Sequence, residues 1–146
     1  MFNPTRDQVR EFFFETWRKY RAAEPLAGAE TIALDAALLH PEFHKVLDDP
    51  EHYREQGWFP EMGETNPFLH LSLHLALEEQ LSIDQPAGVR ERFDELLRAK
   101  GGDRHAALHE ALECLAEMVW RSQKDGQPPD ADAYLENLRK RAGRQK

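Results

Sequence analysis

The chain has 146 residues, of which 40% are hydrophobic and 32% charged, and its formal net charge is −8. We expect one helical domain over residues 1–146, with a basic tail from about residue 141. The negative charge argues against nucleic acid as a partner, because phosphates would be repelled. The single cysteine, Cys114, excludes an internal disulfide and fits a cytoplasmic location. No apolar run approaches the roughly 18 residues of a membrane span, so we expect no membrane association.

Caps and breaks divide the chain into helices, and no stretch shows the alternation of a strand. The predicted helices are a first one from Asn3-Pro4 to about Tyr20, then residues 26–39, a short turn after Pro50, and residues 66–81, 88–100, 103–124 and 130–141. Pro41 interrupts the second helix, and residues 57–65 are a predicted loop. We therefore expect an all-α fold, a single antiparallel bundle of about five to seven helices.

Six of the seven histidines form three pairs with a spacing of four residues. These pairs are His40 with His44, His70 with His74, and His105 with His109. The last two continue to Glu78 and Glu113, and the two resulting trios are 35 positions apart. On a helix such residues share one face, so each trio presents two imidazoles and a carboxylate together. This ligand set is typical of a protein-bound transition metal.

The first trio lies within the apolar face of its predicted helix, so we expect it to be buried. A buried carboxylate such as Glu78 needs compensation, which a metal cation supplies directly. In the second trio, His105 and His109 are better inward candidates than Glu113. If the two trio helices run parallel, their ligands can form one mononuclear or dinuclear site.

Pro41 divides the remaining pair, so we expect His40 to act as a cap and His44 to supply an additional ligand. The predicted metal ligands are His70, His74, Glu78, His105 and His109, with His44 and Glu113 as helpers. Mixed imidazole and carboxylate ligands suit iron, manganese or zinc, and the sequence does not choose among them. Catalysis stays open, because no substrate motif accompanies these residues.

Two alternatives stand beside the metal hypothesis. In the first, the protein is a non-enzymatic interaction module, and its histidines form a buried polar network. Its partner would then be a second copy of the chain or another protein. In the second, two facing histidines hold a haem.

One resemblance to a known family covers nearly the whole chain. The segment Asn66-Pro67-Phe68-Leu69-His70-Leu71-Ser72-Leu73-His74, continued through Pro86, resembles the central motif of an uncharacterised proteobacterial family, the domain of unknown function numbered 1841. Residues 1–4 and 128–135 fit the same family. The resemblance implies a bacterial cytoplasmic protein and supplies no activity.

A second resemblance is partial. His74-x3-Glu78 and His105-x3-His109 are similar to two of the di-iron ligand motifs of hemerythrin-like bundles. That family also needs a His-x4-Asp motif on a late helix, and the predicted helix after Asp130 contains no histidine. The oxygen binding of that family is therefore not expected here.

Overall fold

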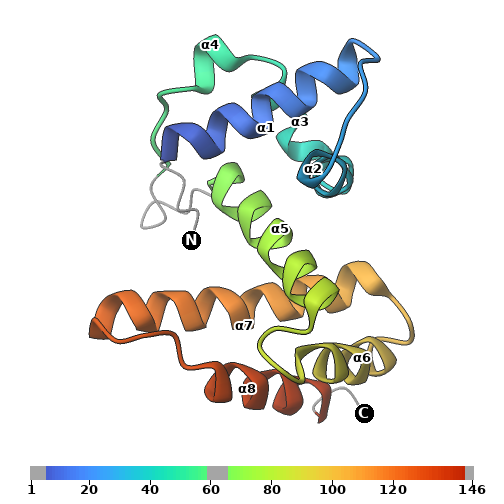
Figure 1. Ribbon diagram of the computed structural model, residues 1–146, viewed down its shortest axis with the longest axis vertical. Helices are drawn as coiled ribbons and strands as arrows, with labels where there is room; N and C mark the ends of the chain where they lie inside the picture. The colour runs from blue at the N-terminus through green and yellow to red at the C-terminus, as the bar shows by residue number, and fades with distance from the viewer. Residues whose placement is uncertain (1–5, 59–65, 144–146) are drawn as a thin grey trace. The chain divides into compact units, whose positions relative to one another are not determined.

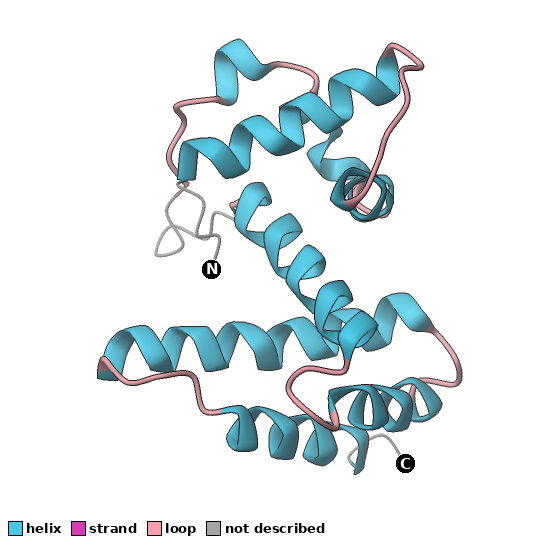
Figure 2. Cartoon of the chain, viewed as in Figure 1, coloured by secondary structure: helices cyan, strands magenta, loops and turns pink. Residues whose placement is uncertain are grey.

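The computed structural model describes residues 6–58 and 66–143, and every regular element within them is a helix (Figures 1 and 2). The elements are α1 (Arg6–Arg21), α2 (Ala29–Leu38), the 3₁₀ turn η1 (Pro41–Phe43), α3 (His44–Leu47), α4 (Pro50–Tyr53), α5 (Pro67–Ile83), α6 (Val89–Ala99), α7 (Arg104–Asp125) and α8 (Ala131–Gly143). The all-α prediction is confirmed. These segments contain eight α-helices rather than five to seven, because α3 and α4 are single turns of four residues. None of the described helices is long and apolar enough to cross a membrane.

The capping residues act as their positions predict. The Asn66 side chain accepts hydrogen bonds from the backbone N–H groups of Phe68 and Leu69, at 2.9 and 3.2 Å. Asp103 and Asp130 accept equivalent bonds at the starts of α7 and α8. Such caps satisfy N–H groups that have no partner inside the helix. The expected start at Asn3-Pro4 lies outside the described residues, as does most of the expected loop 57–65.

The contacts group into two compact units, Met1–Leu75 and Ala76–Lys146. Their boundary falls inside α5, which is continuous from Pro67 to Ile83. The sequence does not show this boundary, because a helix that continues through it lacks the Pro-, Gly- or Ser-rich segment that marks a linker between domains. The expectation of one domain stays a prediction beside this grouping, and each unit is described by itself.

The first unit contains α1 to α4 and the N-terminal part of α5. Its core comprises Phe13, Phe14, Trp17, Ala33, Ala36, Ala37, Val46, Leu47, Phe68 and Leu71. The rings of Phe14 on α1 and Phe68 on α5 meet edge to face at 5.2 Å, a preferred geometry for aromatic pairs. Small alanines give α2 a face against which α1 packs closely. The α5 segment that carries His70 and His74 is thus held by the core of this unit.

The second unit contains the C-terminal part of α5 with α6, α7 and α8, and the last three pack against one another. Helices α7 and α8 are antiparallel and joined by a short loop (Figure 1). The buried apolar residues include Leu77, Val89, Phe93, Leu96, Leu108, Leu112, Leu115, Tyr134 and Leu138. Arg141, at the predicted start of the basic tail, instead forms an ion pair with Glu110 at 2.7 Å and another with Glu113.

Hydrogen bonds to the carboxylate of Asp48 join α1 to the end of α3. The Trp17 indole N–H donates to an Asp48 carboxylate oxygen at 2.6 Å, and the Arg21 guanidinium donates to both carboxylate oxygens at 3.1 Å. Partial burial by itself raises the pKa of Asp48. The hydrogen bonds from Trp17 and Arg21 lower this pKa by a larger amount, so it lies below the ordinary value of an aspartate. The charged carboxylate is therefore the form that stabilises the first unit.

We expect Asp48→Asn to destabilise the protein by about 1 kcal/mol at neutral pH, because it removes the charge from these hydrogen bonds. A group with a lowered pKa stabilises the fold above its unfolded-state pKa, and this contribution is lost as pH falls through the folded-state pKa. The difference in thermal midpoint between wild type and variant should thus be largest near pH 7 and shrink below about pH 4.

The matched control is Asp35→Asn, which removes one carboxylate from the exposed face of α2. It should shift the midpoint by less than Asp48→Asn at pH 7. Equal midpoints for Asp48→Asn and wild type at neutral pH would show that this contact contributes no stability.

Candidate metal centre

His40 lies just after the end of α2, in a conformation that Pro41 imposes. Its φ and ψ of −127° and 71° are not helical, since a residue before proline avoids the helical region. The side chain is 3% exposed, and its Nδ1 lies 2.7 Å from the carbonyl oxygen of Ala36. A carbonyl oxygen only accepts hydrogen bonds, so Nδ1 carries the proton. The neutral ring then keeps the lone pair on Nε2, which is the arrangement found in many metal-ligating histidines.

Helix α5 brings two more imidazoles to the lone pair of His40. Nε2 of His70 lies 3.0 Å from Nε2 of His40. The ring centroids of His70 and His74 lie 4.6 and 4.7 Å from that of His40, and 5.0 Å from each other. Each ring offers one nitrogen, and these nitrogens all lie within 4.8 Å of one another. We call these three residues, His40, His70 and His74, the histidine cluster.

The dimensions of the histidine cluster fit a metal ion. Zinc–nitrogen bonds of about 2.05 Å at tetrahedral angles place two ligand nitrogens about 3.3 Å apart. The 3.0 Å separation between His40 and His70 needs only a small adjustment to reach that value. The cluster can therefore hold a metal ion through three imidazoles from two segments of the first unit.

An aromatic ring of the first unit packs against the histidine cluster, and two of the three histidines are buried. The Phe43 ring stacks nearly parallel to His40, with centroids 5.4 Å apart, and meets His70 edge to face at 5.6 Å. His74 is only 2% exposed, and its neighbour on α5, Leu71, is fully buried. His70 is partly exposed. Charge–charge interactions are strong in such an environment because little water screens them.

His44, the expected helper, is not part of the histidine cluster. Its Nε2 lies 2.8 Å from the carbonyl oxygen of Ala37, so Nε2 carries a proton. Its ring packs against Trp17, with centroids 4.5 Å apart. The structure thus engages the His44 side chain in the packing of the first unit.

The two expected carboxylate ligands have arginine partners. Glu78 forms an ion pair with Arg104 at 2.9 Å, and its side chain is 26% exposed. Glu78 therefore has a cationic partner in Arg104, and its role as a metal ligand stays a prediction. Glu113, at 67% exposure, forms an ion pair with Arg141. The partial resemblance to hemerythrin-like bundles is not confirmed by these contacts.

The other expected ligands, His105 and His109, are on α7 in the second unit. Their ring centroids are 4.3 Å apart, as the four-residue spacing implies. His105 is exposed and His109 is partly buried, whereas the sequence pattern favours an inward position for both. Their role as metal ligands stays a prediction.

His40 is not among the ligands that the sequence predicts, because Pro41 indicates a cap at this position, and His40 is indeed the N-cap residue of η1. The signal that could have found it is local. His40 follows Ala36 by four residues at the end of a helix, so its Nδ1–H can return to the Ala36 carbonyl. This hydrogen bond orients the His40 side chain, whereas the four-residue spacing to His44 does not indicate its orientation.

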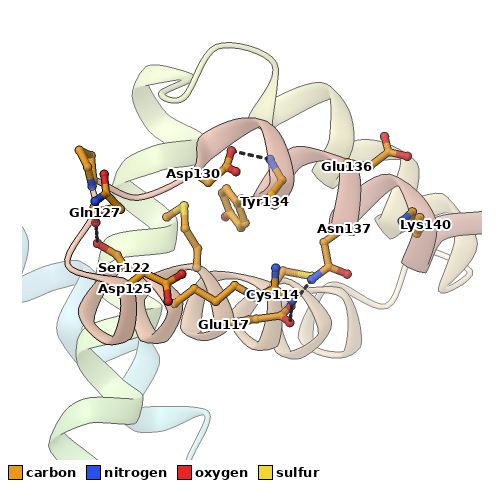
Figure 3. A pocket seen from close by; sticks show the side chains of 14 residues that line it. Cys114, Glu117, Ser122, Asp125, Gln127, Asp130, Tyr134, Glu136, Asn137 and Lys140 are labelled. Atoms are coloured by element: carbon orange, nitrogen blue, oxygen red, sulfur yellow. Dashed lines mark hydrogen bonds and ion pairs between the residues drawn. The ribbon is translucent and has the colours of Figure 1, made fainter.

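A separate groove of about 710 Å³ lies between α7 and α8 in the second unit (Figure 3). Several of its polar side chains form hydrogen bonds with other residues that line the groove. Asn137 donates to Glu117 at 2.7 Å, and Ser122 donates to the Gln127 carbonyl at 2.5 Å. Burial raises the pKa of the Cys114 thiol to about 11, so this thiol stays protonated at neutral pH. Cys114 is therefore not an activated nucleophile.

Comparison with known proteins matches the chain to a family. No curated protein and no solved structure matches the chain. A family match extends over residues 5–140, which is nearly the whole chain and includes all three members of the histidine cluster. The chain therefore belongs to the family described as Domain of unknown function (DUF1841), as the motif around His70 and His74 predicts.

Proposed function

We propose that this protein binds a transition metal, zinc in the first place, through His40, His70 and His74. One observation carries the proposal. The backbone carbonyl of Ala36 holds the proton of His40 on Nδ1, and the lone pair on Nε2 then lies 3.0 Å from a ring nitrogen of His70. An outer hydrogen bond that sets the tautomer of a ligand histidine is a general feature of protein metal sites.

The choice of zinc rests on ligand chemistry. Manganese and magnesium prefer carboxylate and carbonyl oxygens, whereas imidazole suits zinc, copper, iron and nickel. The histidine cluster supplies only imidazoles, and the carboxylate of Glu78 is paired with Arg104. Zinc accepts three histidines with a further position left for another ligand.

The principal competing function rests on the same contact. Two ring nitrogens 3.0 Å apart also fit an N–H···N hydrogen bond, in which His70 donates to His40. The cluster would then be a polar network that stabilises the first unit, in a protein that acts by binding a second copy or another protein. Metal content distinguishes the two functions.

We expect about one equivalent of zinc per chain after loading and removal of excess metal. His40→Ala, His70→Ala and His74→Ala should each weaken zinc binding by roughly 100-fold or more, because each removes a direct ligand. Competition with a chromophoric chelator measures the affinity, and elemental analysis measures the stoichiometry. Circular dichroism at each step establishes that the variants are folded. His70→Ala is the most informative variant, because its side chain is only partly buried.

The matched control is His52→Ala, which removes an exposed histidine from α4. It should bind zinc as wild type does. Folded wild-type protein that takes up no metal would contradict the proposal and favour the polar network. The same titration tests the ligands expected from the sequence. A lowered affinity in His109→Ala would add this residue to the ligand set, and an unchanged affinity would remove it.

We expect Glu78→Gln to leave zinc stoichiometry and affinity unchanged, because the carboxylate of Glu78 pairs with Arg104. The variant should lose less than about 1 kcal/mol of stability, as is usual for partly exposed ion pairs. The two measurements are zinc competition and thermal unfolding. A large loss of zinc affinity would restore Glu78 as a ligand and would revise the proposed all-imidazole site.

A further inference from the structure

We infer that the metal held by the histidine cluster takes a small exchangeable anion as a further ligand. The inference rests on the proposed metal binding and follows from the charge of the ligand set. Each of the three imidazoles binds as a neutral group, so a divalent ion would keep its full charge. An additional histidine ligand would leave that charge unchanged.

Five acidic side chains of the first unit form ion pairs away from the histidine cluster. Asp48 pairs with Arg21, Glu30 with Lys19, Glu11 with Arg54, and both Glu15 and Glu24 with Arg18. Within residues 6–58 and 66–143, the donor groups gathered at the cluster are imidazoles. Compensation of the metal charge by these carboxylates would require their existing ion pairs to break.

The burial of two of the three imidazoles makes this charge costly. His40 and His74 are almost fully buried, and Phe43 contacts the rings of both His40 and His70. An uncompensated charge in such a place is strongly unfavourable, and an anionic ligand removes most of that cost. The anion is hydroxide from water, or a small carboxylate or inorganic anion that displaces it.

Geometry limits the size of this ligand and allows its exchange. The three histidines of the first unit supply three ligands of a zinc ion, and zinc takes one further ligand in a tetrahedral site or two when it expands to five-coordinate. The Phe43 ring covers one side of His40 and His70 and restricts the space beside them. His70 is partly exposed, so the cluster is not sealed from solvent. A small anion such as azide or acetate satisfies both conditions.

The test uses the full chain loaded with Co²⁺, which has visible absorption bands that respond to its ligands. Azide and acetate are titrated separately, with perchlorate as a control for ionic strength. We expect azide to shift the bands in a saturable manner, with a dissociation constant of about 1 mM or lower, and perchlorate to have no effect. The same azide-dependent shift should occur in His52→Ala.

The outcomes separate this inference from the proposed function. Cobalt bands that appear on loading but do not change up to about 100 mM azide would overturn the inference and leave metal binding in place. Failure of the folded protein to bind cobalt and zinc would overturn both. A response to azide without one to acetate would restrict the ligand class to small inorganic anions and support the inference.

Discussion

The hydrogen bond from His40 Nδ1 to the carbonyl of Ala36 is the interaction on which the histidine cluster depends. Helix α2 ends at Leu38, and Pro41 prevents the helix from continuing through His40. The ring therefore turns back over the last turn of its own helix, and the 2.7 Å bond sets both its orientation and its tautomer. Without that bond, the orientation of the ring and the nitrogen that carries its proton would both be undefined. Nε2 could then face His70 either as a donor or as a lone pair.

Helix α5 gives the cluster its second constraint. His70 and His74 are one turn apart on a rigid element, so their separation is set by helical geometry rather than by a loop. The same helix buries Leu71 in the first unit and Leu77 in the second, so both cores hold it. A metal bound by His70 and His74 would therefore stabilise a helix to which both units contribute, as any ligand of the folded state does.

The positions of the helices were predictable because their signals are local. Asn66, Asp103 and Asp130 cap α5, α7 and α8 close to the expected residues. The site was predictable only in part. A helical wheel places His70 and His74 on one face, but it cannot show that Glu78 meets Arg104, which lies 26 residues further along the chain. The ion pair between Glu78 and Arg104 is such a long-range contact, and no spacing along α5 indicates it.

The sequence by itself determined the helical class, the helix boundaries to within a few residues, the family, and the shared face of His70 and His74. All of these follow from spacings of a few residues and from one motif. Only the tertiary structure decided that His40 meets His70 across 30 residues and that His44 packs on Trp17 instead. The physical reason is that such contacts depend on how the apolar faces of α1, α2 and α5 pack together. Packing of this kind is set by long-range shape complementarity, which periodicity along one helix does not encode.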